Sequence, residues 1–222
     1  ANPQAAIIDR SADLKLIRNT GGLNYHVIIA DREGTRIPAF ADRNVRLAMA
    51  HSINRAAFGR AVLFGLGVDS YQPYGKGNWA YNPAVEGAYA YDLAKARDLM
   101  AKSAFPKGFT FDMPSIPIYK SRLEALAGFF KEIGITMNIV PQEPGTLARV
   151  SRTTNFPATN LVWATNTDPK FLALRYVFED AAYNPFKAKP SSELLALAKQ
   201  GLDSADVKVR APAYQKMAEQ LA

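Results

Sequence analysis

The sequence predicts an α/β fold whose sheet is at least partly parallel. Short apolar segments rich in β-branched residues alternate with amphipathic segments whose apolar residues recur every three to four positions. Strands that are separated by helices favour parallel pairing, because a parallel pair needs a crossover connection. No internal repeat and no linker interrupts the 222 residues. We therefore expect residues 1–222 to form a single domain, and a chain of this length buries a normal core without disulfides.

The first predicted elements are a strand and two helices. The segment "LNYHVIIA" (23–30) is apolar enough for a buried strand. Asp42 is expected to cap a helix over 42–53, and Asn54 the helix that follows. Gly65 and Gly67 are expected to end this second helix. Its predicted core-facing stripe consists of Ala57, Phe58, Ala61 and Val62.

A second helix–strand unit follows the loop at 71–91. Asp92 is expected to cap a helix that Pro106 and Gly108 stop, and "FTFDM" (109–113) then alternates like a strand. The buried stripe of this helix is predicted to be Leu93, Ala96, Leu99, Met100 and Ala104.

The remaining elements continue the alternation. The predicted order is a long helix within 119–135 ended by Gly134, strands at 135–140 and 159–165, a helix started by Asp168-Pro169, and two amphipathic helices in 191–222. Pro212 interrupts the last helical pattern, so we expect this helix to be kinked there or to start later.

Composition excludes several classes of protein. Cysteine is absent, which excludes disulfides, thiol nucleophiles and cysteine-ligated metals. No apolar run reaches the ~18 residues that a membrane helix needs. The formal net charge is +7, but Lys and Arg are interspersed with Asp and Glu, which is typical of a solvated surface. We therefore expect no nucleic-acid partner. A basic α/β nucleic-acid-binding domain remains an alternative, and clustered surface cations would favour it.

The sequence carries no catalytic motif that we recognise. There is no G-x-S-x-G, no P-loop and no G-x-G-x-x-G after a strand. His26 and His51 have no second ligand at metal-binding spacing, so packing explains them better than a metal site. We expect no cofactor, no metal and no enzyme activity. A hydrolase with an unrecognised site remains a second alternative, which paired groups with perturbed pKa values would favour.

Aromatic residues gather in the loop at 71–91. Rings in a Pro/Gly framework can line a ligand cleft, because they lose few rotamers on binding. They can equally pack a compact surface loop against itself, and composition favours neither reading. The aromatic residues of the loop are Tyr71, Tyr74, Trp79, Tyr81, Tyr89 and Tyr91, and Trp163 stands alone before a polar stretch.

Three segments resemble family 5 extracytoplasmic solute-binding proteins, the peptide, oligopeptide and nickel receptors of ABC importers. "FADRNVRLAMAHSINRAAFGRAVLFGLG" (40–67) is similar to the family signature F-x-D-x-R-V-R-x-A-x-x-x-A-I-D-R, with Asn54 in place of the usual Asp. The stretch from Trp79 to Phe109 resembles the family's W-G-Y-N-P loop, its Y-D-x-x-K-A-x-x-L-L helix and its Y-P-x-G-F close. "VWATNTDP" resembles its W-x-x-D…D-P segment. The resemblance covers essentially the whole chain.

The resemblance implies a fold, a function and partners. It implies a lobe like those of type II periplasmic binding proteins, with a mixed sheet flanked by helices. Residues 1–222 would be the second, C-terminal lobe of a two-lobe receptor, truncated at both ends, and Ala1 suggests a processed or recombinant fragment. Its partners would be a small peptide or peptide-like solute, the missing N-terminal lobe and the transmembrane subunits of an ABC permease. Its location would be the periplasm or the outer face of a membrane.

The resemblance also suggests ligand-binding residues, with Trp163 and Asn166 as the first candidates and Trp79, Tyr81 and Met113 behind them. In the dipeptide-binding branch, an Asp three residues after the Trp captures the ligand's amino group, and an Arg before a Pro captures its carboxylate. Asn166 and Met113 occupy these positions here. Both charged groups are thus replaced by neutral ones, so we expect a blocked or longer peptide, an opine-like compound or a sugar conjugate. A gap would instead place Asp168 in the amine position, although Asp168 also suits a helix cap.

Overall fold

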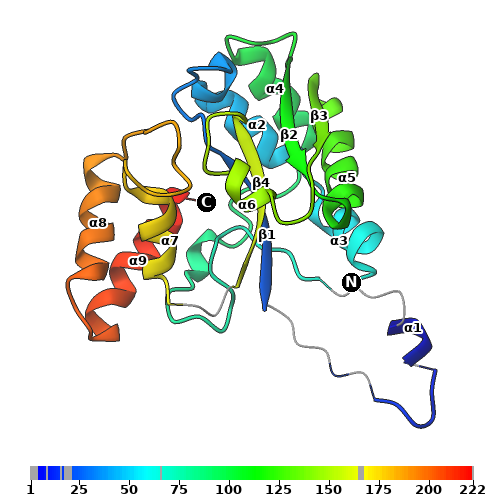
Figure 1. Ribbon diagram of the computed structural model, residues 1–222, viewed down its shortest axis with the longest axis horizontal. Helices are drawn as coiled ribbons and strands as arrows, with labels where there is room; N and C mark the ends of the chain where they lie inside the picture. Colours follow the sequence, from blue (N-terminus) through cyan, green and yellow to red (C-terminus); the bar gives the residue numbers. More distant parts are fainter. Residues whose placement is uncertain are drawn as a thin grey trace.

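The strands form two two-stranded ladders, which confirms the predicted α/β class (Figure 1). The computed structural model describes residues 5–8, 10–15, 17, 22–65, 67–164 and 168–221, without the side chains of positions 5, 6 and 163. Strand β1 (Leu23–Ile29) pairs antiparallel with β4 (Ala158–Ala164). Strand β2 (Phe109–Ser115) pairs parallel with β3 (Ile135–Pro141). The predicted parallel pairing is therefore present in one ladder.

The two ladders lie next to each other through β2 and β4. The Asn160 amide on β4 donates a hydrogen bond of 2.7 Å to the carbonyl oxygen of Pro114 on β2. A side chain thus satisfies a buried strand carbonyl, since a buried polar group without a partner is costly. In the β1–β4 register, Tyr25 lies opposite Val162 and Asn24 opposite Trp163.

Helices cover the ladders and form a separate layer at the carboxyl end of the chain (Figure 1). None of the helices in the described ranges is both long and apolar enough to cross a membrane. The helices are α1 (Ala5–Ile8), η1 (Pro38–Ala41), α2 (Arg43–Ser52), α3 (Arg55–Leu63), η2 (Pro83–Val85), α4 (Leu93–Lys102), η3 (Pro117–Tyr119), α5 (Lys120–Lys131), α6 (Leu147–Val150), α7 (Lys170–Leu172), the π-helical turn η4 (Ala173–Val177), α8 (Ser192–Leu202) and α9 (Val207–Leu221).

The three predicted helix caps are confirmed. The Asp42 carboxylate accepts from the backbone N–H of Asn44 at 2.8 Å and begins α2. The Asn54 side chain accepts from Ala57 N at 2.9 Å and begins α3. Asp92 accepts from Lys95 N at 2.9 Å and begins α4. Each side chain satisfies a backbone donor that has no partner within its helix.

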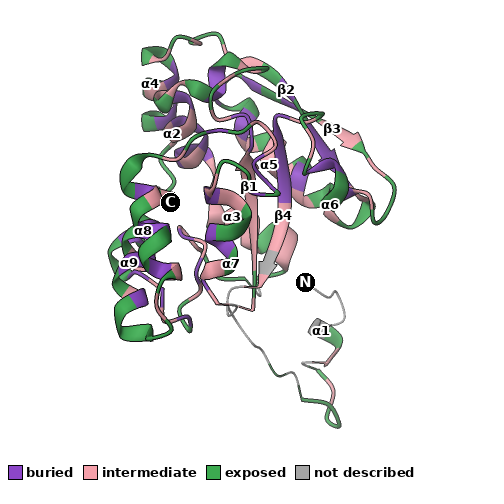
Figure 2. Ribbon diagram, turned by 60° about the vertical axis from the view of Figure 1, so that its left-hand side comes forward, coloured by how far each residue is buried: buried purple, intermediate pink, exposed green. Residues whose placement is uncertain are grey.

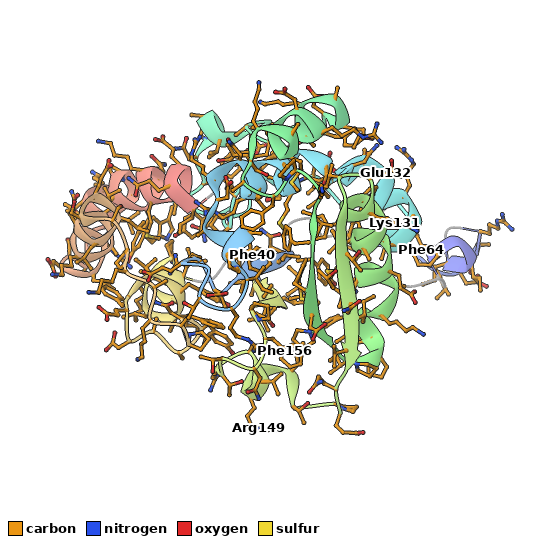
Figure 3. All side chains as sticks on the ribbon, turned by 90° about the horizontal axis from the view of Figure 1, so that it is seen from above. Phe40, Phe64, Lys131, Glu132, Arg149 and Phe156 are labelled. Atoms are coloured by element: carbon orange, nitrogen blue, oxygen red, sulfur yellow. The ribbon has the colours of Figure 1, made fainter. Side chains whose placement is uncertain are left out.

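Phe40 is at the centre of the first hydrophobic cluster (Figure 3). Its ring is fully buried and meets Phe109 and Phe111 of β2 edge-on, at centroid distances of 5.5 and 5.1 Å. Leu123 and Phe130 bring α5 onto the same cluster. The strands and helices of the two predicted helix–strand units therefore share one core.

A second hydrophobic cluster holds the carboxyl-terminal helices. Tyr214 and Met217 of α9 and Leu194 of α8 pack with residues of the aromatic loop, including the fully buried Tyr74. The outer faces of α8 and α9 are exposed (Figure 2). The loop at 71–91 therefore packs into the second cluster, to which it contributes Tyr74, Ala80 and Val85.

Two expectations about helices are corrected. Helix α3 has no buried residue, because it lies on the rim of a concave surface; Ala61 of its predicted stripe is exposed and Phe58 is half-buried. Helix α9 does not start late but runs from Val207 through Pro212. The proline removes one backbone donor, and the burial of Tyr214 and Met217 in the second cluster offsets this loss.

We predict that Gly108→Ala destabilises the protein far more than Gly87→Ala does. Both glycines have left-handed backbone, with φ of +79° and +74°. A Cβ at Gly108 would lie 1.8 Å from the carbonyl oxygen of Gly134, whereas a Cβ at Gly87 meets nothing within 4 Å. Urea unfolding should show a loss of roughly 1–2 kcal/mol for Gly87→Ala and of roughly 3 kcal/mol or more for Gly108→Ala. Equal losses would contradict the close approach of the two backbones.

Candidate functional site

A large concave surface lies on the β1 side of the molecule, with a volume of about 1330 Å³. Strand β1 forms its floor together with residues 160–162 of β4, and α2, α3 and α5 contribute residues to its walls. The segment 67–78 and the end of α9 complete the rim. The volume exceeds the ~300–1,000 Å³ typical of a small-molecule pocket, so the surface is wide enough for a solute larger than a single amino acid.

Tyrosines dominate the side chains of this surface. Tyr176 and Tyr183, in tilted contact at 5.3 Å, belong to it. Burial and a hydrogen bond with Glu86 raise the pKa of Tyr81 to about 12, and burial raises the pKa of Tyr176 well above its usual range. A phenol is neutral at pH 7 even at its ordinary pKa of about 10, and these shifts keep both groups able to donate and accept hydrogen bonds. Eight of the chain's ten tyrosines line the surface: Tyr25, Tyr71, Tyr74, Tyr81, Tyr89, Tyr119, Tyr176 and Tyr183.

His26 lines the same surface from β1. Burial lowers the pKa of its imidazole to about 4, and its ring meets Tyr176 edge-on at 6.5 Å. The ring is therefore neutral at physiological pH. Within the part of the chain that the structure describes, no three His, Cys, Asp or Glu side chains come close enough together to hold a metal ion.

Polar side chains fix the aromatic loop at its two ends. Gln72 and Asn82 exchange hydrogen bonds: Gln72 Nε2 donates to the Asn82 carbonyl at 2.6 Å, and Asn82 N donates to Gln72 Oε1 at 2.8 Å. The Asn82 amide also donates to Gln215 O at 3.0 Å and to Glu219 Oε1 at 2.8 Å. Asn82 thereby ties the loop to α9.

Arg55 and His51 fix the other side of the loop. The Arg55 guanidinium donates to the carbonyls of Ser70 and Tyr89 and lies over the Tyr71 ring, 4.6 Å from its centroid. His51, which is buried on α2, is hydrogen-bonded through Nδ1 to Ala90 O at 2.8 Å. Four rings of the loop, Tyr71, Tyr74, Tyr81 and Tyr89, therefore line the concave surface from a fixed backbone.

The charged residues of the concave surface are mostly basic. Six basic side chains line it against three acidic ones, so the lining favours anions. The basic residues are Arg32, Arg43, Arg46, Arg55, Lys76 and Arg122, and the acidic ones are Asp69, Glu86 and Glu219.

The six predicted ligand-binding residues are dispersed. Tyr81 lines the concave surface. Trp79 is half-buried and packs on Tyr214 at 5.7 Å. Met113 is fully buried in the first hydrophobic cluster, where it has no surface to offer a ligand. Asn166 and the side chain of Trp163 lie outside the described residues.

Asp168 is paired with Arg210 in two parallel hydrogen bonds, of 3.0 and 2.5 Å. Its carboxylate also accepts from Lys170 N at 2.9 Å, so it stabilises the start of α7 as expected. Burial opposes ionisation, but the hydrogen bonds from Arg210 and Lys170 and their charges outweigh it and hold the pKa of Asp168 below its usual value. The Arg210 guanidinium stacks over Trp79 at 5.0 Å. Asp168 is therefore already neutralised by a cation of the chain.

The structure brings together Arg122, Tyr25 and Tyr119, which the sequence analysis did not identify as site residues. Arg122 on α5 lies over the rings of Tyr25 and Tyr119, 3.9 and 5.3 Å from their centroids. The spacing of Tyr119 and Arg122 along a helix was a visible signal, because residues three apart are neighbours on a helix surface. The contribution of Tyr25 depends on long-range strand pairing, for which no local signal exists.

Comparison with known proteins identifies the family. Residues 1–185 match the model of bacterial extracellular solute-binding proteins, family 5 Middle. The match covers most of the chain, so this protein belongs to that family. The result confirms the resemblance that the sequence motifs indicated.

Individual relatives agree with this assignment. The chain is 26% identical over 159 residues to the dipeptide-binding protein of Escherichia coli K12, which covers 68% of this chain and 28% of the relative. A periplasmic binding protein of Helicobacter pylori solved with the peptide STSA superimposes with a TM-score of 0.84 at 20% identity, over 98% of this chain and 43% of that one. A binding protein of Agrobacterium solved with agropinic acid has a TM-score of 0.78 at 20% identity, over 98% and 45% of the two chains. The chain thus spans less than half the length of these proteins, and the structures show that it has their fold.

We predict that Asn82→Ala loosens the aromatic loop. The substitution removes the side-chain bonds to Gln215 and Glu219 and the bond that Asn82 Oδ1 accepts from Ala84 N. Chemical unfolding should show a loss of roughly 2–4 kcal/mol, whereas the control Asn155→Ala, at an exposed position, should change stability by less than about 0.5 kcal/mol. A loss no larger than the control's would show that the loop does not depend on Asn82.

We predict that the Asp168–Arg210 pair contributes stability that acid removes. Because the pKa of Asp168 is lowered in the folded state, its contribution is present above the unfolded-state pKa near 3.8 and disappears as the pH falls through the folded value. Asp168→Asn should therefore destabilise the protein at pH 7, and the difference from wild type should shrink between about pH 4 and lower pH. Urea unfolding at several pH values measures this, with Asp180→Asn, at an exposed position, as the control. A pH-independent difference would contradict the assignment.

Proposed function

We propose that this chain is the second lobe of a two-lobe receptor that captures a small solute for an ABC importer. Membership of the solute-binding family carries this proposal. The coverage supports it as well, since nearly the whole chain superimposes on less than half of the Helicobacter protein. The receptor would act in the periplasm or at the outer face of a membrane, and the other lobe would come from the rest of the same polypeptide.

Binding in this proposal needs no chemical step. The solute lies on the concave surface of this lobe, and the second lobe closes over it by a hinge motion. The permease subunits then recognise the closed state and receive the solute. No bond is made or broken, so the receptor needs neither catalytic residues nor a cofactor.

We propose a peptide-like ligand whose amino end is not bound by a carboxylate side chain of the receptor. Asn166 stands where the dipeptide-binding branch has its amine-binding Asp. Asp168, the nearest acid in sequence, would have to give up two hydrogen bonds with Arg210 to bind an ammonium group. Trp163, Asn166 and Tyr81 are the proposed ligand contacts. A blocked peptide, an opine-like compound or a sugar conjugate suits such a site better than a free dipeptide.

We predict that the full-length receptor, purified from the periplasm without denaturation, carries a small molecule. Denaturation followed by mass spectrometry of the released fraction identifies it. A peptide-like compound whose amino end is blocked or neutral is the expected result. A peptide with a free amino terminus would contradict the proposed ligand class and leave the receptor function intact. Release of no small molecule, together with no thermal stabilisation by peptides or opines, would contradict the receptor function itself.

A further inference from the structure

Arg122 presents a cation to the concave surface without an anionic partner. Its guanidinium carbon lies 3.9 Å from the centroid of Tyr25 and 5.3 Å from that of Tyr119. Within the described ranges no carboxylate lies within ion-pair distance of it, and it donates no hydrogen bond to the protein. Cation–π contacts hold a guanidinium in place without occupying its N–H donors in hydrogen bonds.

Two other arginines of the surface are used differently. Arg46 donates to the carbonyls of Phe40 and Ala41, and Arg55 donates to three carbonyls of neighbouring segments. These two guanidinium groups stabilise the backbone around the site. Arg122 is free to bind a group from outside the lobe.

The position of Arg122 matches the place where α/β sheets bind ligands. Tyr25, on which it stacks, lies opposite Val162, one residue before Trp163 near the carboxyl end of β4. Arg122 itself follows the carboxyl end of β2 through the short turn η3. Ligands of open α/β sheets bind beyond the carboxyl ends of the strands.

We propose that Arg122 binds a carboxylate of the solute. A guanidinium presents a planar fork of N–H donors that matches a carboxylate in a bidentate pair. The two tyrosine rings orient this fork before the ligand arrives, which reduces the entropy lost on binding. The excess of basic residues in the lining favours the same class of ligand. This inference rests on the proposed function and adds to it that the solute carries a carboxylate.

Arg122 would thereby replace a group that the chain lacks. Met113 occupies the position of the carboxylate-binding arginine of the dipeptide-binding branch and is buried in the core. Arg122 follows nine residues later, in the first turn of α5. Arg122 lies on the concave surface and Met113 does not, so of these two residues only Arg122 can contact a solute there.

The test uses the full-length receptor and the peptide STSA in four forms, with the amino end free or acetylated and the carboxyl end free or amidated. Agropinic acid is a fifth probe. Calorimetry should show that wild type binds the peptides with a free carboxyl end more tightly than the amidated peptides. We expect this difference whether the amino end is free or acetylated. Arg122→Gln should weaken binding of the free carboxylates by roughly 10- to 100-fold and leave the amides nearly unchanged. Arg122→Lys keeps the charge without the fork and should lie in between.

Arg149→Gln is the matched control. Arg149 is exposed on α6, outside the concave surface, and its side chain lies at the edge of the molecule (Figure 3). Its loss removes the same charge and should change every affinity by less than about twofold. The role of Arg122 would be overturned if wild type bound the acids and the amides equally, or if Arg122→Gln and Arg149→Gln lost the same affinity. Either result would leave the proposed function standing. A wild-type receptor that binds none of the five probes would overturn the proposed function and this inference with it.

Discussion

The fixed position of the aromatic loop is the constraint on which the concave surface depends. The loop packs into the second hydrophobic cluster, where Tyr74 is buried. The reciprocal bonds of Gln72 and Asn82 and the bonds from Arg55 to the carbonyls of Ser70 and Tyr89 hold its backbone. A loop packed only by its own side chains would not place rings on a neighbouring surface. Here the same segment packs into the second cluster and lines the concave surface, so it is not packed by its own side chains alone.

Electrostatics give the surface its selectivity in this account. His26 is neutral at pH 7 because burial lowers the pKa of its imidazole to about 4. Burial raises the pKa values of Tyr81 and Tyr176 further above pH 7. The charged groups that remain are mainly arginines. Asp168 is not available to bind a ligand, because its carboxylate is already hydrogen-bonded to Arg210. The concave surface therefore favours a neutral or anionic solute that has apolar groups and groups that can hydrogen-bond to tyrosine hydroxyls.

Local sequence signals predicted most of the helices and strands. Asp42, Asn54 and Asp92 begin their helices as capping rules require, and Met100 and Phe130 are buried where periodicity places them. What could not be predicted depends on contacts between distant segments. The antiparallel pairing of β1 with β4 joins residues more than a hundred positions apart. Helix α3 has an apolar stripe but faces the concave surface, which periodicity alone cannot distinguish from a core.

The candidate site was harder to predict than the fold. Motif matching pointed to Met113, but a position matched in sequence does not show that its side chain faces the cleft, and Met113 faces the core. Tyr81 was identified as one of a group of rings, and the structure places it on the surface. Arg122 does not stand out in the sequence, because an arginine on a helix is normally a solvated group. Its role depends on Tyr25, a partner from another part of the chain.

Hydrogen exchange of the full-length receptor tests the central claim most directly, namely that the solute binds on the concave surface of this lobe. Exchange would be measured by mass spectrometry with and without the solute released from the native protein. We expect slower exchange at 23–29, 67–81 and 116–123, and unchanged exchange in α4 and α8, which lie outside the surface. If the solute did not slow exchange in these three segments, or slowed it only in other parts of the lobe, binding on the concave surface would be contradicted.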